Sequence, residues 1–201
     1  MKQQVLTPPR AFVWGLCLLV TGITSCGPKP GAEHLDALQR TLVQLDSAET
    51  IYRQAPLESA APAFAKADSA LVAIEAQMVG LIVNLEQGKP FTALDERHRM
   101  LRRQPGRQRR IEQELDRTRR QIGHLIEAIV DGASVDAEGT LIDTAYLSKS
   151  AADELRIARH LIEEIGIALQ FLERGTVDLD VVIQTADSTA RALTTIPTQP
   201  Q

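Results

Sequence analysis

The chain has 201 residues, a formal net charge of −4 and a mean hydropathy of −0.10, values that suit a single globular domain. Aromatic residues make up only 3% of the sequence, and the single tryptophan, Trp14, lies near the N-terminus. Surfaces that bind carbohydrate or single-stranded nucleic acid need aromatic faces on which sugars or bases stack. The composition therefore argues against both classes, and its richness in alanine and leucine favours helices throughout.

The first 25 residues have the pattern of a secretory leader. Lys2 and Arg10 supply positive charge, and residues 11–23 form an apolar run that is shorter than the roughly 20 residues of a membrane-spanning helix. The run ends at Ile23-Thr24-Ser25-Cys26, after which the composition changes to Gly27-Pro28-Lys29-Pro30. Cleavage by the ordinary signal peptidase after the small residues is the alternative, and the cysteine at the cut favours lipoprotein processing over it.

The stretch resembles the lipobox of bacterial lipoproteins, with an aliphatic residue, two small residues and the cysteine that receives the lipid. The resemblance implies that residues 1–25 are removed and that Cys26 becomes the first residue, carrying a diacylglyceryl group. Two acyl chains suffice for stable membrane anchoring. Gly27 is not the aspartate that retains some lipoproteins in the inner membrane, which favours the outer membrane, facing the periplasm. Cys17 leaves with the leader, so the remaining domain has no disulfide.

Behind a short tether at residues 26–32, apolar residues recur at three- and four-residue steps, the pattern of amphipathic helices. The clearest stripe, in the second helix, includes Leu71, Ile74 and Leu81, which we expect to be buried. Gly88 and Pro90 are expected to end that helix, and Thr92 to cap the next. The helices expected from these signals span residues 33–54, 61–85, 93–104, 107–131, 143–174 and 177–193.

These elements predict an all-α fold, an elongated antiparallel bundle of four to five long helices plus one short helix. No linker of domain-boundary length interrupts the pattern, so we expect one domain at residues 33–194 and a disordered tail at residues 195–201. The second helix should run antiparallel to the first and return to the anchored end. Pro105-Gly106 breaks or kinks the chain, and the sequence leaves open whether residues 93–131 form one kinked helix or two.

Two tetrapeptides, His124-Leu125-Ile126-Glu127 and His160-Leu161-Ile162-Glu163, come nearest to a chemical motif. Di-metal helical bundles use Glu-x-x-His directed into the core. Here Leu125 and Ile162 take the core positions, so the histidines and glutamates should face solvent. The sequence also has no Gly-x-Ser-x-Gly, no His-Glu-x-x-His and no phosphate-binding glycine loop. We therefore expect neither an enzyme nor a metal or cofactor site.

The most unusual feature is basic, because residues 97–120 contain ten arginines. Nucleic acid is an unlikely partner for an exported chain, so the choice is between a solvated face that pairs with acidic neighbours and an anion-facing surface. The candidate partners of such a surface are anionic phospholipid headgroups, lipopolysaccharide phosphates or an acidic envelope protein. A short, turned third helix would bring the first part of this stretch to the bilayer. The predicted anion- and membrane-facing segment consists of Arg97, Arg99, Arg102, Arg103, Arg107, Arg109 and Arg110.

Together these patterns predict a lipid-anchored cell-envelope protein that acts by binding, as a scaffold, adaptor or accessory subunit. The alternative is a small-ligand or metal-binding helical bundle that serves as a carrier in the periplasm. A close-packed core would favour the first interpretation, and an internal cavity of several hundred Å³ would favour the second.

The lipobox interpretation predicts that Cys26→Ser abolishes acylation and leaves the helical domain folded, because Cys26 precedes the first helix. Labelling with radioactive palmitate and circular dichroism measure the two effects. Continued palmitate labelling of the variant, or unchanged partition into membranes, would show that Cys26 is not the lipidation site.

Overall fold

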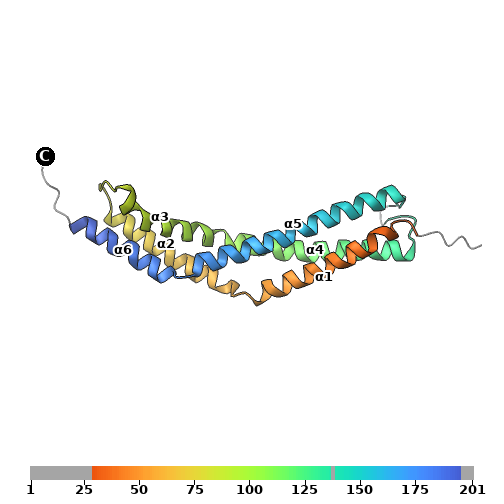
Figure 1. Ribbon diagram of the computed structural model, residues 1–201, viewed down its shortest axis with the longest axis horizontal. Coiled ribbons are helices and arrows are strands. Elements are labelled where there is room, and N and C mark those ends of the chain that lie inside the picture. Colours follow the sequence, from red (N-terminus) through yellow and green to blue (C-terminus); the bar gives the residue numbers. More distant parts are fainter. Residues whose placement is uncertain (1–28, 137–138, 196–201) are drawn as a thin grey trace, which may run out of the picture.

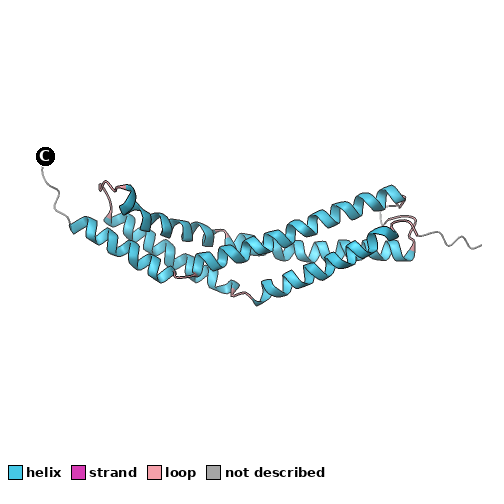
Figure 2. Cartoon of the chain, viewed as in Figure 1, coloured by secondary structure: helices cyan, strands magenta, loops and turns pink. Residues whose placement is uncertain are grey.

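The structure is a computed structural model that describes residues 29–136 and 139–195. The predicted leader, Cys26 and the last six residues lie outside these ranges. Helices form nearly all of the described chain (Figure 2), so the predicted all-α bundle is confirmed. Their bounds are α1 Ala32–Gln54, the short 3-10 helix η1 Leu57–Ser59, α2 Ala60–Gln77, α3 Leu85–Arg102, α4 Gln104–Asp131, α5 Thr144–Thr176 and α6 Leu179–Thr195.

The helices lie along three long rods, each interrupted partway along its length (Figure 1). One rod is α1 followed by α2, the second is α3 followed by α4, and the third is α5 followed by α6. In one half of the molecule α1, α4 and α5 pack together, and in the other half α2, α3 and α6 do so. The molecule is elongated and gently curved. The start of α1 lies at one end, and the α2–α3 turn and the end of α6 lie at the other (Figure 1).

The half built from α1, α4 and α5 has the core that the sequence predicts most fully. The apolar residues that recur at three- and four-residue steps on α4 are buried, and α1 contributes Leu38, Leu45 and Tyr52 to the same interior. On α5, Leu161 is buried and Ile162 only partly so, which corrects the expectation that Ile162 is the core residue. The buried residues of α4 from the predicted stripe are Ile111, Leu115, Ile122, Leu125 and Ile129.

The half built from α2, α3 and α6 relies on small residues. Its core contains Ala67 of α2 and Ala186 and Ala190 of α6, and all three are fully covered. Small side chains let the helix backbones approach closely, and larger residues such as Ile74 and Leu101 fill the remaining space.

The three rods break close to one another, and each break has a local cause. Pro56 fixes the preceding residue in the extended conformation, which ends α1. Pro105, the second residue of α4, has no N–H to continue a hydrogen-bonded helix from α3. Asp178, between α5 and α6, has a φ of 52° in the left-handed region.

Three contacts hold the breaks together in one region of the molecule, which we call the joint. The Gln104 side chain is buried, and its Nε2 donates a hydrogen bond to the Ala168 carbonyl at 2.9 Å. Gln108 Nε2 donates to the Leu57 carbonyl at 3.2 Å. Gly175 lies so close to Leu101 that a Cβ added to the glycine would be 2.9 Å from the leucine side chain. Gly175 is therefore a close-packing residue inside α5, one residue beyond the predicted end of that helix.

The expected extents of the second and third helices are wrong. α2 ends at Gln77, and the chain reverses through Gly80, whose φ is 80°. Asn84 then begins α3 with a capping box, in which its side chain and that of Gln87 each accept a hydrogen bond from the other's backbone N–H. This cap precedes the expected Thr92 cap by eight residues, so Gly88 and Pro90 lie within α3.

The expected hairpin of the first two helices is also wrong. α2 continues away from α1 along the same rod and does not return to the start of α1 (Figure 1). Because α3 then runs back to the joint, the seven arginines predicted to face an anion lie at mid-length and not at the end where α1 begins. The prediction that these arginines face the membrane required them to lie near the start of α1. They do not lie there.

The boundary of α2 generates a stability prediction. Ile74→Ala should lower the free energy of unfolding by about 2–5 kcal/mol, because the side chain is 4% exposed within a packed core. Leu81→Ala, beyond the end of α2, should cost less than about 1 kcal/mol. Urea unfolding measures both, and equal large losses would indicate that α2 extends through Leu81.

Candidate functional site

The seven arginines predicted to face an anion occupy the end of α3 and the beginning of α4. Arg97, Arg99 and Arg102 belong to the last turns of α3, Arg103 is the single residue between the helices, and the other three belong to the first turns of α4. All seven therefore lie on both sides of the central joint. The first turn of α4 contains no acidic residue, so no side chain there balances the partial positive charge of the helix N-terminus.

Two of the seven arginines are neutralised by carboxylates. Arg99 pairs with Asp95 one turn earlier on α3 at 3.0 Å, and Arg110 reaches across to Glu164 of α5 at 2.7 Å. The remaining five form no ion pair among the described residues. We call these five the joint cluster: Arg97, Arg102, Arg103, Arg107 and Arg109.

Within the joint cluster, Arg102, Arg103 and Arg109 are exposed to solvent. Arg97 and Arg107 are partly buried, and the Nε of Arg97 and one terminal nitrogen of Arg107 are covered without a hydrogen-bond partner among the described residues. The Arg107 guanidinium also lies over the ring of Phe171, 4.6 Å from its centroid, which holds its plane in place. Because guanidinium groups only donate hydrogen bonds, the unpaired donors at the joint suit an anion or another acceptor.

The arginines farther along α4 have a structural role. Arg119 binds Asp46 of α1 at 2.7 Å and also contacts Glu49, so it joins the two helices. Hydrogen bonds from Arg119 hold the pKa of Glu49 below its ordinary value, against the opposing effect of burial. Arg117 and Arg120 pair with acidic residues of their own helix. The basic stretch therefore contains five paired arginines and the five arginines of the joint cluster, which form no ion pair among the described residues.

The histidine and glutamate pairs do not converge. His124, Glu127, His160 and Glu163 are all exposed, as the sequence predicts. Among the residues that the structure describes, no group of three or more histidine, cysteine, aspartate or glutamate side chains is placed to hold a metal ion.

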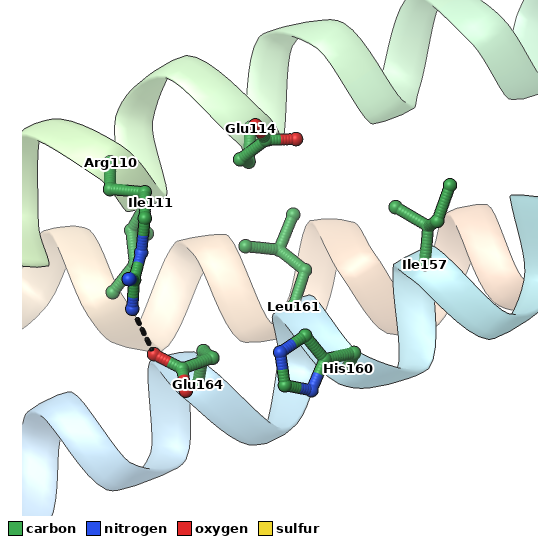
Figure 3. Close-up of a pocket in the computed structure, with 7 residues that line it drawn as sticks. All are labelled: Arg110, Ile111, Glu114, Ile157, His160, Leu161 and Glu164. Atoms are coloured by element: carbon green, nitrogen blue, oxygen red, sulfur yellow. Dashed lines mark hydrogen bonds and ion pairs between the residues drawn. The ribbon is translucent and has the colours of Figure 1, made fainter.

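A groove between α4 and α5 lies next to the joint cluster (Figure 3). It has a volume of about 280 Å³ and is open to solvent. Arg110 and Glu164 close one side by their ion pair, His160 lies on the α5 rim, and Leu161 and Ile157 point from α5 towards α4 (Figure 3). Its seven lining residues include no serine, threonine or cysteine, so the groove contains no hydroxyl or thiol nucleophile.

A second groove, of about 460 Å³, lies where the end of α4 and the beginning of α5 meet the connecting loop. Gln121 and Glu154 are among its lining residues, and Oε1 of Gln121 and Oε2 of Glu154 are covered without a hydrogen-bond partner. Burial raises the pKa of Glu154, and the negative charge of Asp153 adds to the effect, whereas Arg117 opposes it. The lining thus combines two side chains that carry unpaired acceptors with apolar side chains that include Leu125 and Ile142.

Sequence reasoning missed one surface feature, the apolar turn between α2 and α3. Val79, Ile82 and Leu85 fall within the helix predicted for residues 61–85, and instead they belong to this turn and are 81%, 98% and 84% exposed. The signal that could have revealed the turn is Asn84 followed three residues later by Gln87, the pattern of a helix N-terminus.

Comparison of the chain with protein-family models, curated proteins and solved structures found no match. None of the described helices is both long enough and apolar enough to cross a membrane.

The contact between Arg119 and Glu49 generates a pH prediction. The folded state lowers the pKa of Glu49, so this contact stabilises the fold above the ordinary carboxyl pKa and is lost as the pH falls through the folded-state value. Glu49→Gln should therefore lower the free energy of unfolding by about 1 kcal/mol at neutral pH. The difference from the unmodified chain should shrink towards about pH 3.

Urea unfolding at both pH values measures this effect. Glu163→Gln is the matched control, because Glu163 is exposed and forms no ion pair among the described residues. The Glu49 contact would be energetically unimportant if both variants behaved alike at both pH values.

Proposed function

We propose that this protein is a lipid-anchored cell-envelope protein that acts by binding, as a scaffold, adaptor or accessory subunit, and that the joint cluster recognises an anionic partner. The anchor is the lipid on Cys26, and the favoured location is the outer membrane, facing the periplasm. The elongated bundle would hold the joint cluster at a fixed distance from the anchored end.

The observation that carries this proposal is the lack of acidic partners for the joint cluster in a chain that is acidic overall. The net charge is −4, and carboxylates elsewhere pair with arginines on the same helix or on neighbouring helices. At the joint, five arginines and the N-terminus of α4 lack such compensation. A bound anion would supply it, because carboxylates and phosphates accept hydrogen bonds from guanidinium groups in pairs.

The position of the joint favours an acidic protein over the headgroups of the anchoring membrane. α1 has 23 residues and a length of about 35 Å, and it separates the start of the bundle from the joint. Charges interact weakly with a surface that lies several Debye lengths of about 8–10 Å away. A bundle that stands upright on its anchor would therefore present Arg102, Arg103 and Arg109 to another protein.

A carrier of small ligands is the second candidate. The groove lined by Gln121 and Glu154 favours it, because two covered acceptors without donors suit a ligand that donates hydrogen bonds. The groove is open to solvent and lies at the surface, whereas the interior of each half is filled by packed side chains. This arrangement supports the binding protein more than the carrier.

The proposal predicts that a chain beginning at residue 29 binds polyglutamate, used as a stand-in for an acidic protein, and that binding weakens between about 0.01 M and 0.15 M salt. Replacing Arg102, Arg103 and Arg109 together with glutamine should remove most of this binding, because these side chains are exposed and unpaired. Isothermal titration calorimetry measures the affinity.

The matched control replaces Arg40, Arg156 and Arg191 with glutamine. This change removes the same charge from exposed arginines that pair within their own helices. If the two triple variants lose binding equally, net charge alone is responsible, and the joint cluster is not a specific site.

A further inference from the structure

We propose that the turn between α2 and α3 inserts its aliphatic side chains into the interfacial layer of an uncharged lipid bilayer. We call residues 78–85 the tip loop. This inference does not depend on the joint cluster or on the proposed anionic partner.

The exposure of the tip loop is far greater than that of a typical apolar segment. Ile82 is 98% exposed, Leu85 is 84% exposed and Val79 is 81% exposed. Leu81 adds a further partly exposed side chain, at 38%. Scattered single apolar residues on a protein surface need no explanation, whereas a contiguous group marks a surface that is covered in use.

The fold holds these side chains outward. Met78, at the start of the loop, packs against the core of the half built from α2, α3 and α6. Gly80 adopts a left-handed conformation that a larger residue would strain, and it turns the chain. Asn84 and Gln87 then close the capping box of α3. The loop is thus fixed at both of its ends, and its apolar side chains project between these points.

The size of the tip loop argues against a second copy of the chain as its occupant. A stable protein–protein interface covers about 800 Å² on each partner and involves about 20–30 residues a side. A loop of eight residues at one end of the elongated bundle offers much less surface area. Insertion into a bilayer needs only a few aliphatic side chains that reach about 5–10 Å into the boundary between headgroups and acyl chains.

The charge distribution identifies the kind of bilayer. Residues 76–85 carry no charge, and the nearest charged residues on either side, Glu75 and Glu86, are both acidic. Glu86 pairs with Lys89, so the loop and its flanks carry little net charge, which suits an uncharged, zwitterionic lipid surface. The loop lies at the end of the molecule opposite the start of α1, where the last turns of α6 lie beside it (Figure 1).

A single-tryptophan reporter tests the proposal directly. A chain that begins at residue 29 keeps every core residue of the bundle and contains no tryptophan, because Trp14 lies in the leader. In that chain we would place the reporter by Ile82→Trp and add phosphatidylcholine vesicles. The tryptophan emission should shift to shorter wavelength, and brominated phosphatidylcholine should quench it. Both effects should persist at high salt, because no charge is involved.

The matched control is Val72→Trp, at a 60% exposed position on the flank of α2. Its emission should not change on the same vesicles. Replacing Val79, Ile82 and Leu85 with serine should reduce vesicle partition about tenfold or more and leave the helical signal intact.

Three outcomes would overturn the proposal. The first is an unchanged emission spectrum for Ile82→Trp at excess phosphatidylcholine, and the second is equal quenching of both reporters. The third is a concentration-dependent dimer that the triple serine variant abolishes without any vesicle binding, because the tip loop would then be an interface between copies. Loss of polyglutamate binding on changing the joint cluster would leave the vesicle result unaffected, so the two proposals fail separately.

Discussion

The architecture depends on three chain breaks that lie side by side. Pro56, Pro105 and the left-handed Asp178 interrupt the three rods, and the chain bends where they meet. The break in one rod is tied to the others by Gln104, which binds the backbone of α5, and by Leu101, which packs against Gly175.

The joint also explains where unpaired charge collects. Along the straight part of α4, Arg119 reaches the acidic side chains of α1 and becomes part of the interhelical packing. At the joint, Arg103 lies between two helices and Arg109 is exposed on α4, and neither forms an ion pair among the described residues. One basic stretch of sequence therefore serves packing at one end and presents free charge at the other.

The sequence was sufficient to predict the helical class, the inward positions of α4 and the outward positions of His124 and His160, because each follows from local periodicity. It failed between α2 and α3. Residues 78–85 continue an apolar spacing that fits a helix, while Gly80 and the Asn84–Gln87 cap impose a turn. Periodicity cannot decide between these two signals, since the decision depends on whether the neighbouring rods extend far enough to cover Ile82 and Leu85.

The same error gave a wrong predicted position for the arginines of the candidate site. The expected hairpin of the first two helices would have returned the arginines to the anchored end, and the joint keeps them at mid-length. Whether Pro56 reverses the chain or merely bends it is a tertiary matter, because proline ends a helix without fixing the direction of the next one. The pairing of Arg110 with Glu164 and the burial of Gln104 likewise involve partners more than 50 residues away and leave no local signal.

The distance between the two ends of the first rod tests this account most directly. The chain from residue 29 contains no cysteine, so Asp36→Cys and Ile82→Cys provide two unique sites for spin labels. α1 and α2 in line predict a distance of about 55 Å between the labels by double electron–electron resonance. A distribution centred below about 20 Å, as expected for two helices packed side by side in a hairpin, would contradict the three-rod architecture.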